Sequence, residues 1–187
     1  MKKVAVVYHS GHGHTECMAK KVVEGVGSVA GVEVDLLKAD ALSAAPEQLI
    51  DYDGFIWGSP TYLGGVSGVF KTFMDATGRL WKNQQLKGKL ASGFTVSSLP
   101  AGDKQTTLLS MVVFSMQHGM LWIGNSLMPE QHSGVPYEQA VNRLGSWTGM
   151  MAQADHGAAA DRFEPGDIRT AKLFGQNFAN ALVRLAV

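Results

Sequence analysis

The chain begins with a short apolar segment that is followed at once by a glycine-rich turn and a helical pattern. Residues 4–8 (VAVVY) are apolar and rich in β-branched side chains, which is typical of a strand buried on both faces of a parallel sheet. Residues 10–15 (SGHGHT) form the turn, and Met18, Val22 and Val26 then recur on one helical face. A strand, a turn and a helix in this order direct backbone N–H groups and the positive end of the helix toward one spot. We therefore expect an anion site at the turn.

The residue types in the turn restrict which anion binds there. A nucleoside triphosphate loop needs a lysine that this turn lacks, and a dinucleotide fingerprint needs a third glycine where this chain has Glu16. The remaining pattern, Ser10-x-x-Gly13-x-Thr15, is suited to wrapping one terminal phosphate. It resembles the phosphate loop of flavodoxin-like proteins, which hold the phosphate of FMN. On this motif alone, a plain turn that binds nothing remains the alternative.

The composition is that of an ordinary globular protein. The chain has 187 residues, of which 45% are hydrophobic and 17% charged, and this fits one domain over residues 1–187. Basic and acidic residues are balanced at 16 each, so we expect no nucleic-acid partner and no membrane insertion. The single cysteine allows no internal disulfide, and the first apolar run is too short for a signal-peptide core, so we expect a cytoplasmic protein.

Strand and helix patterns alternate along the rest of the chain. We expect strands over residues 32–37, 54–58, 89–96 and 120–123, and helices over residues 67–81, 104–117 and 167–185. Residues 40–51 are expected to form a loop around Pro46 that can include a short turn of helix. Residues 124–149 show little periodicity, which in a compact domain indicates an insertion after the fifth strand or a functional segment.

This alternation predicts an α/β fold with a doubly wound, five-stranded parallel sheet and right-handed crossovers. In such sheets ligands bind beyond the carboxyl ends of the strands. Three loops with special residue types, at 10–15, 59–65 and 97–103, all fall at that edge. Their convergence predicts one ligand site built from all three loops.

Several motifs together resemble one known family. They are residues 58–64 (GSPTYLG), 70–81 (FKTFMDATGRLW), 106–110 (TTLLS) and 117–120 (QHGM), with 12–14 (HGH) in the first loop. These motifs are similar to those of the WrbA-type NAD(P)H:quinone oxidoreductases of the flavodoxin-like superfamily. The resemblance covers about residues 3–124 and is weaker from 125 to 166. This chain departs from the family's pattern at Gly11-His12, and its third loop is less glycine-rich.

The resemblance implies FMN as the cofactor. No metal is expected at the clustered histidines His9, His12 and His14, because the glycine turn between them has a phosphate to bind. The first loop would hold the phosphate, the second would line one edge of the flavin ring, and the third would hold the pyrimidine end of the ring. Backbone donors near the ring would tune its potential, which is the protein's contribution to flavin chemistry. The implied cofactor-binding residues are Ser10, Gly11, His12, Gly13, His14, Thr15, Pro60, Thr61, Tyr62, Leu63, Gly64, Ser97, Ser98, Leu99, Ala101, Gly102 and His118.

Three side chains are candidates for substrate contact and catalysis. The resemblance implies that Tyr62, Trp81 and His118 surround the ring, where the aromatic residues stack on planar substrates and His118 donates a hydrogen bond to a quinone oxygen. Structural alternatives remain for each: an exposed turn aromatic for Tyr62, a core residue for Trp81, and a partner of the helix dipole for His118. Cys17 is expected to be a packed thiol rather than a nucleophile.

The helix expected over residues 104–117 is apolar on nearly all sides, with Met111, Val112, Val113, Phe114 and Met116 in sequence. Such a helix is either deeply buried or covered by another subunit. Together with the long segment 124–149, it leads us to expect a homo-dimer or homo-tetramer.

The leading hypothesis for function is an FMN-dependent enzyme that carries two electrons from NADH or NADPH to a quinone. The first alternative is a flavodoxin-type protein that shuttles single electrons, but shuttles usually dock through an acidic face and this chain has zero net charge. The second alternative is an FMN-free interaction domain on the same fold. Three intact ligand loops argue against that alternative.

Overall fold

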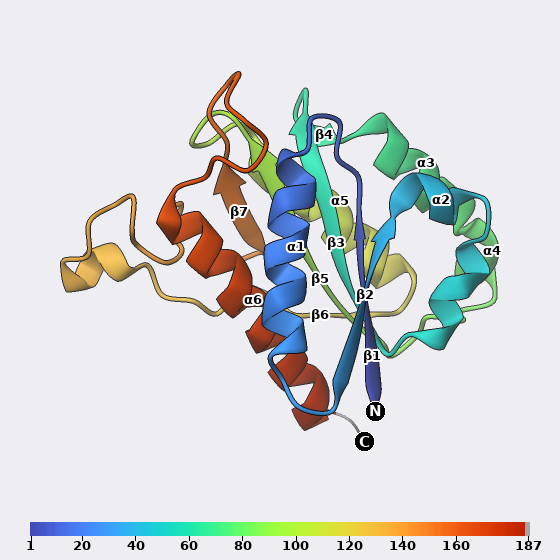
Figure 1. Cartoon of the computed structure of the whole chain (residues 1–187). Helices are drawn as coiled ribbons and strands as arrows, with labels where there is room; N and C mark the ends of the chain where they lie inside the picture. The colour runs from blue at the N-terminus through green and yellow to red at the C-terminus, as the bar shows by residue number, and fades with distance from the viewer. Residues whose placement is uncertain (186–187) are drawn as a thin grey trace.

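The structure, a computed structural model, describes residues 1–185 and contains a doubly wound parallel sheet (Figure 1). The strands are β1 (Lys2–Tyr8), β2 (Val32–Lys38), β3 (Gly54–Tyr62), β5 (Leu90–Ser97), β6 (Leu121–Trp122) and β7 (Met150–Gln153). Their order is β2-β1-β3-β5-β6, with β7 also paired to β5, and all of these pairings are parallel. A two-residue strand, β4 (Gly65–Val66), folds back antiparallel on the end of β3. The predicted sheet is thus confirmed.

Helices cover both faces of the sheet (Figure 1). On one face lie α1 (His14–Gly27) and α6 (Pro165–Leu185), and on the other lie α2 (Ala39–Ser43), α3 (Gly68–Ala76), α4 (Gly78–Lys82) and α5 (Lys104–Gln117). Short 3₁₀ turns occupy Pro46–Asp51 and Glu130–Ser133. Within residues 1–185, no helix combines the length and the apolar character that crossing a bilayer requires.

The alternation of side chains along β1 explains the two layers, because successive residues of a strand point to opposite faces. Val4 and Val6 pack in the cluster under α1 and α6, whereas Ala5 and Val7 pack in the cluster under α3 and α5. All four side chains are fully buried. Strand β1 therefore contributes side chains to both hydrophobic cores, one on each face of the sheet.

The fifth strand position differs from the prediction. We expected one strand over residues 120–123 followed by an insertion, but β6 pairs with only the first two residues of β5, Leu90 and Ala91. The last four residues of β5, from Phe94 to Ser97, pair with β7, a strand that the sequence patterns did not predict. The segment 123–149 thus interrupts the fifth position between two short strands, and in Figure 1 it loops outward beside α6.

Two other elements depart from expectation. The helix expected over residues 67–81 breaks at Thr77 into α3 and α4, because the Thr77 hydroxyl donates to the carbonyl of Met74 (2.7 Å) and ends the first helix. The third strand continues four residues beyond its predicted end, from Gly58 to Tyr62, and carries the ligand-loop residues with it. The region around Pro46, predicted as a loop that can include a short helical turn, contains α2 and a 3₁₀ turn, in agreement with that prediction.

Candidate functional site

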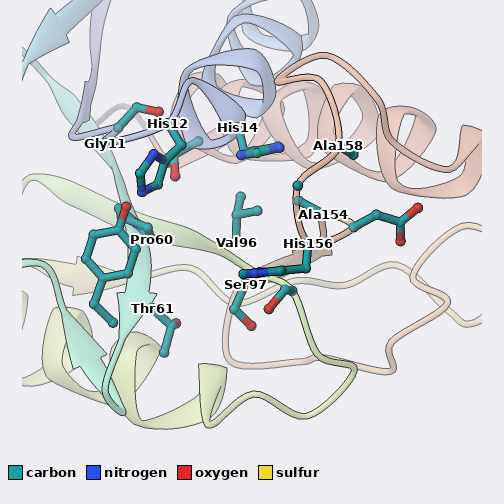
Figure 2. A pocket seen from close by; sticks show the side chains of 16 residues that line it. Gly11, His12, His14, Pro60, Thr61, Val96, Ser97, Ala154, His156 and Ala158 are labelled. Carbon is teal, nitrogen blue, oxygen red and sulfur yellow. The ribbon is translucent and has the colours of Figure 1, made fainter.

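A cavity of about 510 Å³ opens at the carboxyl edge of the sheet. Figure 2 shows His12 and His14 on one side of it, Thr61 and Ser97 on another, and His156 facing in from a later part of the chain. Four segments form its walls: the phosphate loop (residues 10–15), the end of β3, the third loop (97–103) and a cover loop (154–163). The lining residues are Ser10, Gly11, His12, His14, Thr15, Pro60, Thr61, Tyr62, Val96, Ser97, Ser98, Ala154, Asp155, His156, Gly157 and Ala158.

The phosphate loop turns sharply into α1 at Gly13. Gly13 has φ +88°, a left-handed conformation that glycine adopts without strain, and its carbonyl accepts the first helical bond from the Cys17 N–H (2.9 Å). A Cβ at this position would lie 2.6 Å from the Cβ of Ala160 in the cover loop. Both the backbone conformation and the close approach of the cover loop therefore require glycine here.

Two polar atoms of the phosphate loop are buried without a protein partner. Within the described chain, Oγ of Ser10 and Nε2 of His14 lack any hydrogen bond. Buried polar groups are almost always paired, so such atoms indicate a missing ligand. The first-turn N–H groups of α1 add further donors at the same place. This donor set fits a phosphate monoester, and no lysine or arginine of residues 1–185 lines the cavity beside it.

The second predicted loop is a tight hairpin whose tip stays outside the cavity. Leu63 and Gly64 both have positive φ (48° and 80°), as in a type I′ turn, and Leu63 is fully exposed. Only Pro60, Thr61 and Tyr62 line the cavity. The Tyr62 hydroxyl lies over Gly11, where a Cβ would approach it to 2.6 Å. Tyr62 therefore joins the hairpin to the phosphate loop.

The third loop contributes Ser97 and Ser98 to the cavity wall, whereas Leu99, Ala101 and Gly102 are not among the lining residues. Gly102 has φ +50°, and an added Cβ would collide with the Ser97 hydroxyl. Thr95, two residues before the loop, shares a buried hydrogen bond with Thr61 (2.8 Å), and Thr61 also shares one with Thr107 (2.8 Å). These hydroxyls fix the ends of β3 and β5 relative to α5.

The cover loop is a functional segment that sequence reasoning missed. Its residues Asp155 and His156 line the cavity, Ala160 touches the position of Gly13, and Phe163 packs edge-to-face on His14 with ring centroids 6.0 Å apart. One sequence signal could have indicated this loop. The apolar residues 150–152 (MMA) are followed by a glycine-containing stretch and a helix, which is the same strand–turn–helix order as at the start of the chain.

Within one chain, Trp81 and His118 do not line the cavity that Tyr62 lines. This differs from the prediction that the three residues surround one flavin ring together. Trp81 and His118 both line a separate groove of about 770 Å³ between α3–α4 and α5. Three apolar side chains are about half exposed there: Trp81 (49%), Leu109 (48%) and Val113 (55%). Trp81 lies on α4 and His118 directly follows α5, so both belong to the helical layer rather than to the carboxyl edge of the sheet.

His118 is buried at the base of the groove and its protonation can be assigned. The Thr77 hydroxyl donates its own proton to Met74, so it accepts from Nε2–H of His118 at 3.0 Å. The Nδ1 atom is buried without a partner in the described chain and is left as an acceptor. Burial also lowers the pKa of His118, which keeps the ring neutral at pH 7. The neutral ring cannot donate from Nδ1, contrary to the predicted role.

The cysteine behaves as expected of a packed thiol. Cys17 is partly buried in the first turn of α1, and desolvation raises the pKa of its thiol. A raised pKa leaves little thiolate at neutral pH, so the group is a poor nucleophile.

Comparisons with known proteins agree with this geometry. A family model described as NADPH-dependent FMN reductase matches residues 29–133. Flavodoxin FldP of Pseudomonas aeruginosa is 36% identical over 96% of both chains, and the NAD(P)H dehydrogenase (quinone) of Archaeoglobus fulgidus is 32% identical over 99% of this chain and 100% of its own. Among solved structures, a WrbA-like flavodoxin from Agrobacterium tumefaciens has a TM-score of 0.76 and 32% identity, covering 98% of this chain and 99% of its own.

The fold and the anion site, taken with these matches, define a flavoprotein of the flavodoxin-like class. The chain belongs to the NADPH-dependent FMN reductase family, and the resemblance to WrbA-type oxidoreductases is confirmed. Its cofactor is FMN, whose phosphate matches the unpaired donors of Ser10 and His14.

Proposed function

We propose that the protein is an FMN-dependent NAD(P)H:quinone oxidoreductase that transfers two electrons from NADH or NADPH to a quinone. The observation that carries this proposal is the shape of the cavity. Residues 154–163 approach the phosphate loop closely, whereas Tyr62 on another wall is 42% exposed, which would leave a planar substrate a surface on which to stack. Two relatives that bear the name NAD(P)H dehydrogenase (quinone) support the choice of substrates.

In this proposal the chain binds FMN through three groups of residues. Ser10, His14 and Thr15 hold the phosphate, assisted by the backbone of residues 11–13. Pro60, Thr61 and Tyr62 flank the ring, with Leu63 and Gly64 at the hairpin tip, and residues 97–102 hold the pyrimidine end. When bound, FMN supplies the acceptor and donor of electrons, and the protein supplies position and electrostatics.

Trp81 and His118 enter the proposal through a second copy of the chain. The groove that they line is continuous with the exposed apolar side chains Leu109 and Val113 of α5, and such a face favours self-association. We propose a homo-oligomer in which this groove covers the open side of a neighbour's cavity. There Trp81 stacks on a planar substrate, and Nδ1 of His118 accepts a hydrogen bond from an N–H donor such as the nicotinamide carboxamide.

A second candidate function is single-electron transfer, as in a flavodoxin. It is favoured by the 36% identity to a protein named flavodoxin. The zero net charge opposes it, because a docking shuttle gains from a charged face.

Anaerobic stopped-flow mixing separates the two functions. For the FMN-loaded protein, we expect NADH or NADPH to bleach the flavin absorbance within seconds and benzoquinone to restore it in one two-electron phase. A protein that neither nicotinamide reduces, but that accepts electrons from dithionite one at a time, would instead be a shuttle.

A further inference from the structure

The third loop directs an unbroken run of carbonyls toward the protein interior. The Ser97 carbonyl accepts from the Ala154 N–H (3.1 Å), and the Ser98 carbonyl accepts from the side-chain amide of Gln153 (3.1 Å). The next three carbonyls accept from one residue. The Lys104 ammonium donates to the carbonyls of Leu99 and Pro100 (3.1 Å to the latter), and the Lys104 N–H donates to the carbonyl of Ala101 (3.1 Å).

The direction of these carbonyls fixes the direction of the loop's donors. In a trans peptide the C=O and the following N–H point in opposite directions, and the chain has no cis peptide bonds in its described part. Inward carbonyls at Ser98, Pro100 and Ala101 therefore aim the N–H groups of Leu99, Ala101 and Gly102 outward. In residues 1–185 these three N–H groups have no protein acceptor. They form a row of free donors on the loop directly after Ser97 and Ser98, which are the two loop residues that line the cavity.

Lys104 is an unusual residue for this position. Its side chain is completely buried at the first residue of α5, where a positive charge also opposes the helix dipole. Desolvation by burial lowers its pKa to about 8, so the ammonium keeps its proton at neutral pH. Burial and the helix dipole both disfavour a positive charge at this position, so the presence of Lys104 indicates a role other than packing.

The surrounding charges leave a net positive charge under the loop. Asp167, at the start of α6, is also buried and raises the Lys104 pKa, but both of its carboxylate oxygens bond Arg143 (2.8 Å each) from the segment 123–149. Arg143 in turn lowers the Lys104 pKa. Asp103, beside Lys104 on the loop, is exposed. Two buried cations thus face one buried anion.

We propose that Lys104 is a positioning residue that aims the donors of residues 99–102 at the pyrimidine end of FMN and adds positive potential there, so that reduced FMN is bound more tightly than oxidised FMN. The proposal rests on the assignment of the third loop to the pyrimidine end. Negative charge gathers on that end of the ring on reduction, so a nearby buried cation favours the reduced form.

The test compares three variants of the FMN-loaded protein. Lys104→Met removes the donor and the charge, and Lys104→Gln keeps a donor without charge. Lys89→Met is the matched control, since Lys89 is a partly buried lysine that also donates to two carbonyls, Leu49 and Ile50, but at the opposite end of β5. Two quantities are measured: the FMN dissociation constant of the apoprotein, and the two-electron potential by dithionite titration, which needs neither nicotinamide nor quinone.

For Lys104→Met we expect oxidised FMN to bind about tenfold more weakly, as loss of charge-assisted hydrogen bonds implies. Reduced FMN should lose about a further tenfold, which for two electrons is a potential about 30 mV more negative. Lys104→Gln should recover the affinity for oxidised FMN but keep the lower potential, and Lys89→Met should change neither. The potential difference between wild type and Lys104→Met should vanish as the pH rises past about 8, where the ammonium loses its proton.

Equal potentials for wild type and Lys104→Met at neutral pH would overturn the proposal. So would a potential difference that persists unchanged at alkaline pH, since that would indicate a distorted loop. If Lys104→Met does not fold, the same comparison with Lys104→Gln decides. Because dithionite replaces both substrates, a failure here differs from a failure of the proposed enzymatic activity, which the nicotinamide assay reports.

Discussion

The cavity at the sheet edge and the groove on the helical layer use different chemistry. The cavity is lined by hydroxyls, imidazoles and backbone groups from loops, and two of its buried polar atoms, on Ser10 and His14, lack partners. The groove is lined mainly by helical side chains, including the exposed apolar residues Trp81, Leu109 and Val113, and within residues 1–185 the Nδ1 atom of His118 is buried there without a partner. The cavity therefore offers unpaired polar atoms to a ligand, whereas the groove exposes apolar side chains to solvent.

Substitution of Gly13 should cause the largest effect and should be confined to the cavity. In Gly13→Val a β-branched residue would have to adopt φ +88° and displace Ala160 of the cover loop, so we expect a loss of FMN affinity of about 100-fold or more. Calorimetric titration measures it. The control is Gly31→Val, which has a similar φ (+81°) but no neighbour within 4 Å, and which should bind FMN normally. Unchanged binding by Gly13→Val would refute the phosphate site.

A charge introduced into the groove should impair the function of the groove and leave the cavity unaffected. Val113→Glu places a carboxylate on the exposed apolar face of α5, so we expect the oligomer to dissociate and reduction by NAD(P)H to fall, with FMN still bound. Light scattering and flavin absorbance report the two properties. Val183→Glu, on an exposed site of α6 (45%), is the matched control. A wild-type particle of 20.0 kDa at micromolar concentration would contradict the proposed assembly.

Ser10→Ala should weaken FMN binding moderately, but it should not lower the stability of the apoprotein. Removing the hydroxyl takes away a phosphate donor, which should weaken FMN binding about tenfold. It also removes a buried polar atom without a partner, so the apoprotein should be as stable as wild type or more stable. Chemical denaturation and calorimetry measure the two quantities, with Ser43→Ala in α2 as a control for both. A destabilised apoprotein would mean that the Ser10 hydroxyl already has a partner.

The smallest expected effect is the pH dependence that His118 contributes to stability. Burial lowers its pKa in the folded state below the unfolded value of about 6.5, so between these values the unfolded chain binds more protons. The free energy of unfolding should therefore fall as the pH is lowered through that window. His118→Gln should flatten this part of the curve in urea titrations at several pH values. An identical curve for the variant would show that His118 is not the titrating group.

Local patterns in the sequence were sufficient for the elements of the cavity but not for their assembly. The phosphate loop and the helix over residues 104–117 could be predicted, because strand–turn–helix order and apolar spacing are local properties. The cover loop could not, since its role depends on contacts with Gly13 and His14 more than 140 residues earlier in the chain. The separation of Trp81 and His118 from Tyr62 also escaped prediction. It depends on contacts between residues far apart in the chain, such as the hydrogen bond between Thr77 and His118, which form only in the folded structure.

The interrupted fifth strand position has a consequence for the order of events during folding. Strand β6 follows β5 after one helix. Strand β7 can pair with β5 only after the segment 123–149 has closed into a long loop, and the entropic cost of closing that loop slows the pairing. The cover loop comes directly after β7, so a newly made chain has its phosphate loop before it has the cover. Cofactor capture should therefore be a late step in the maturation of the protein, detectable as FMN quenching that lags behind the gain of helical signal during refolding.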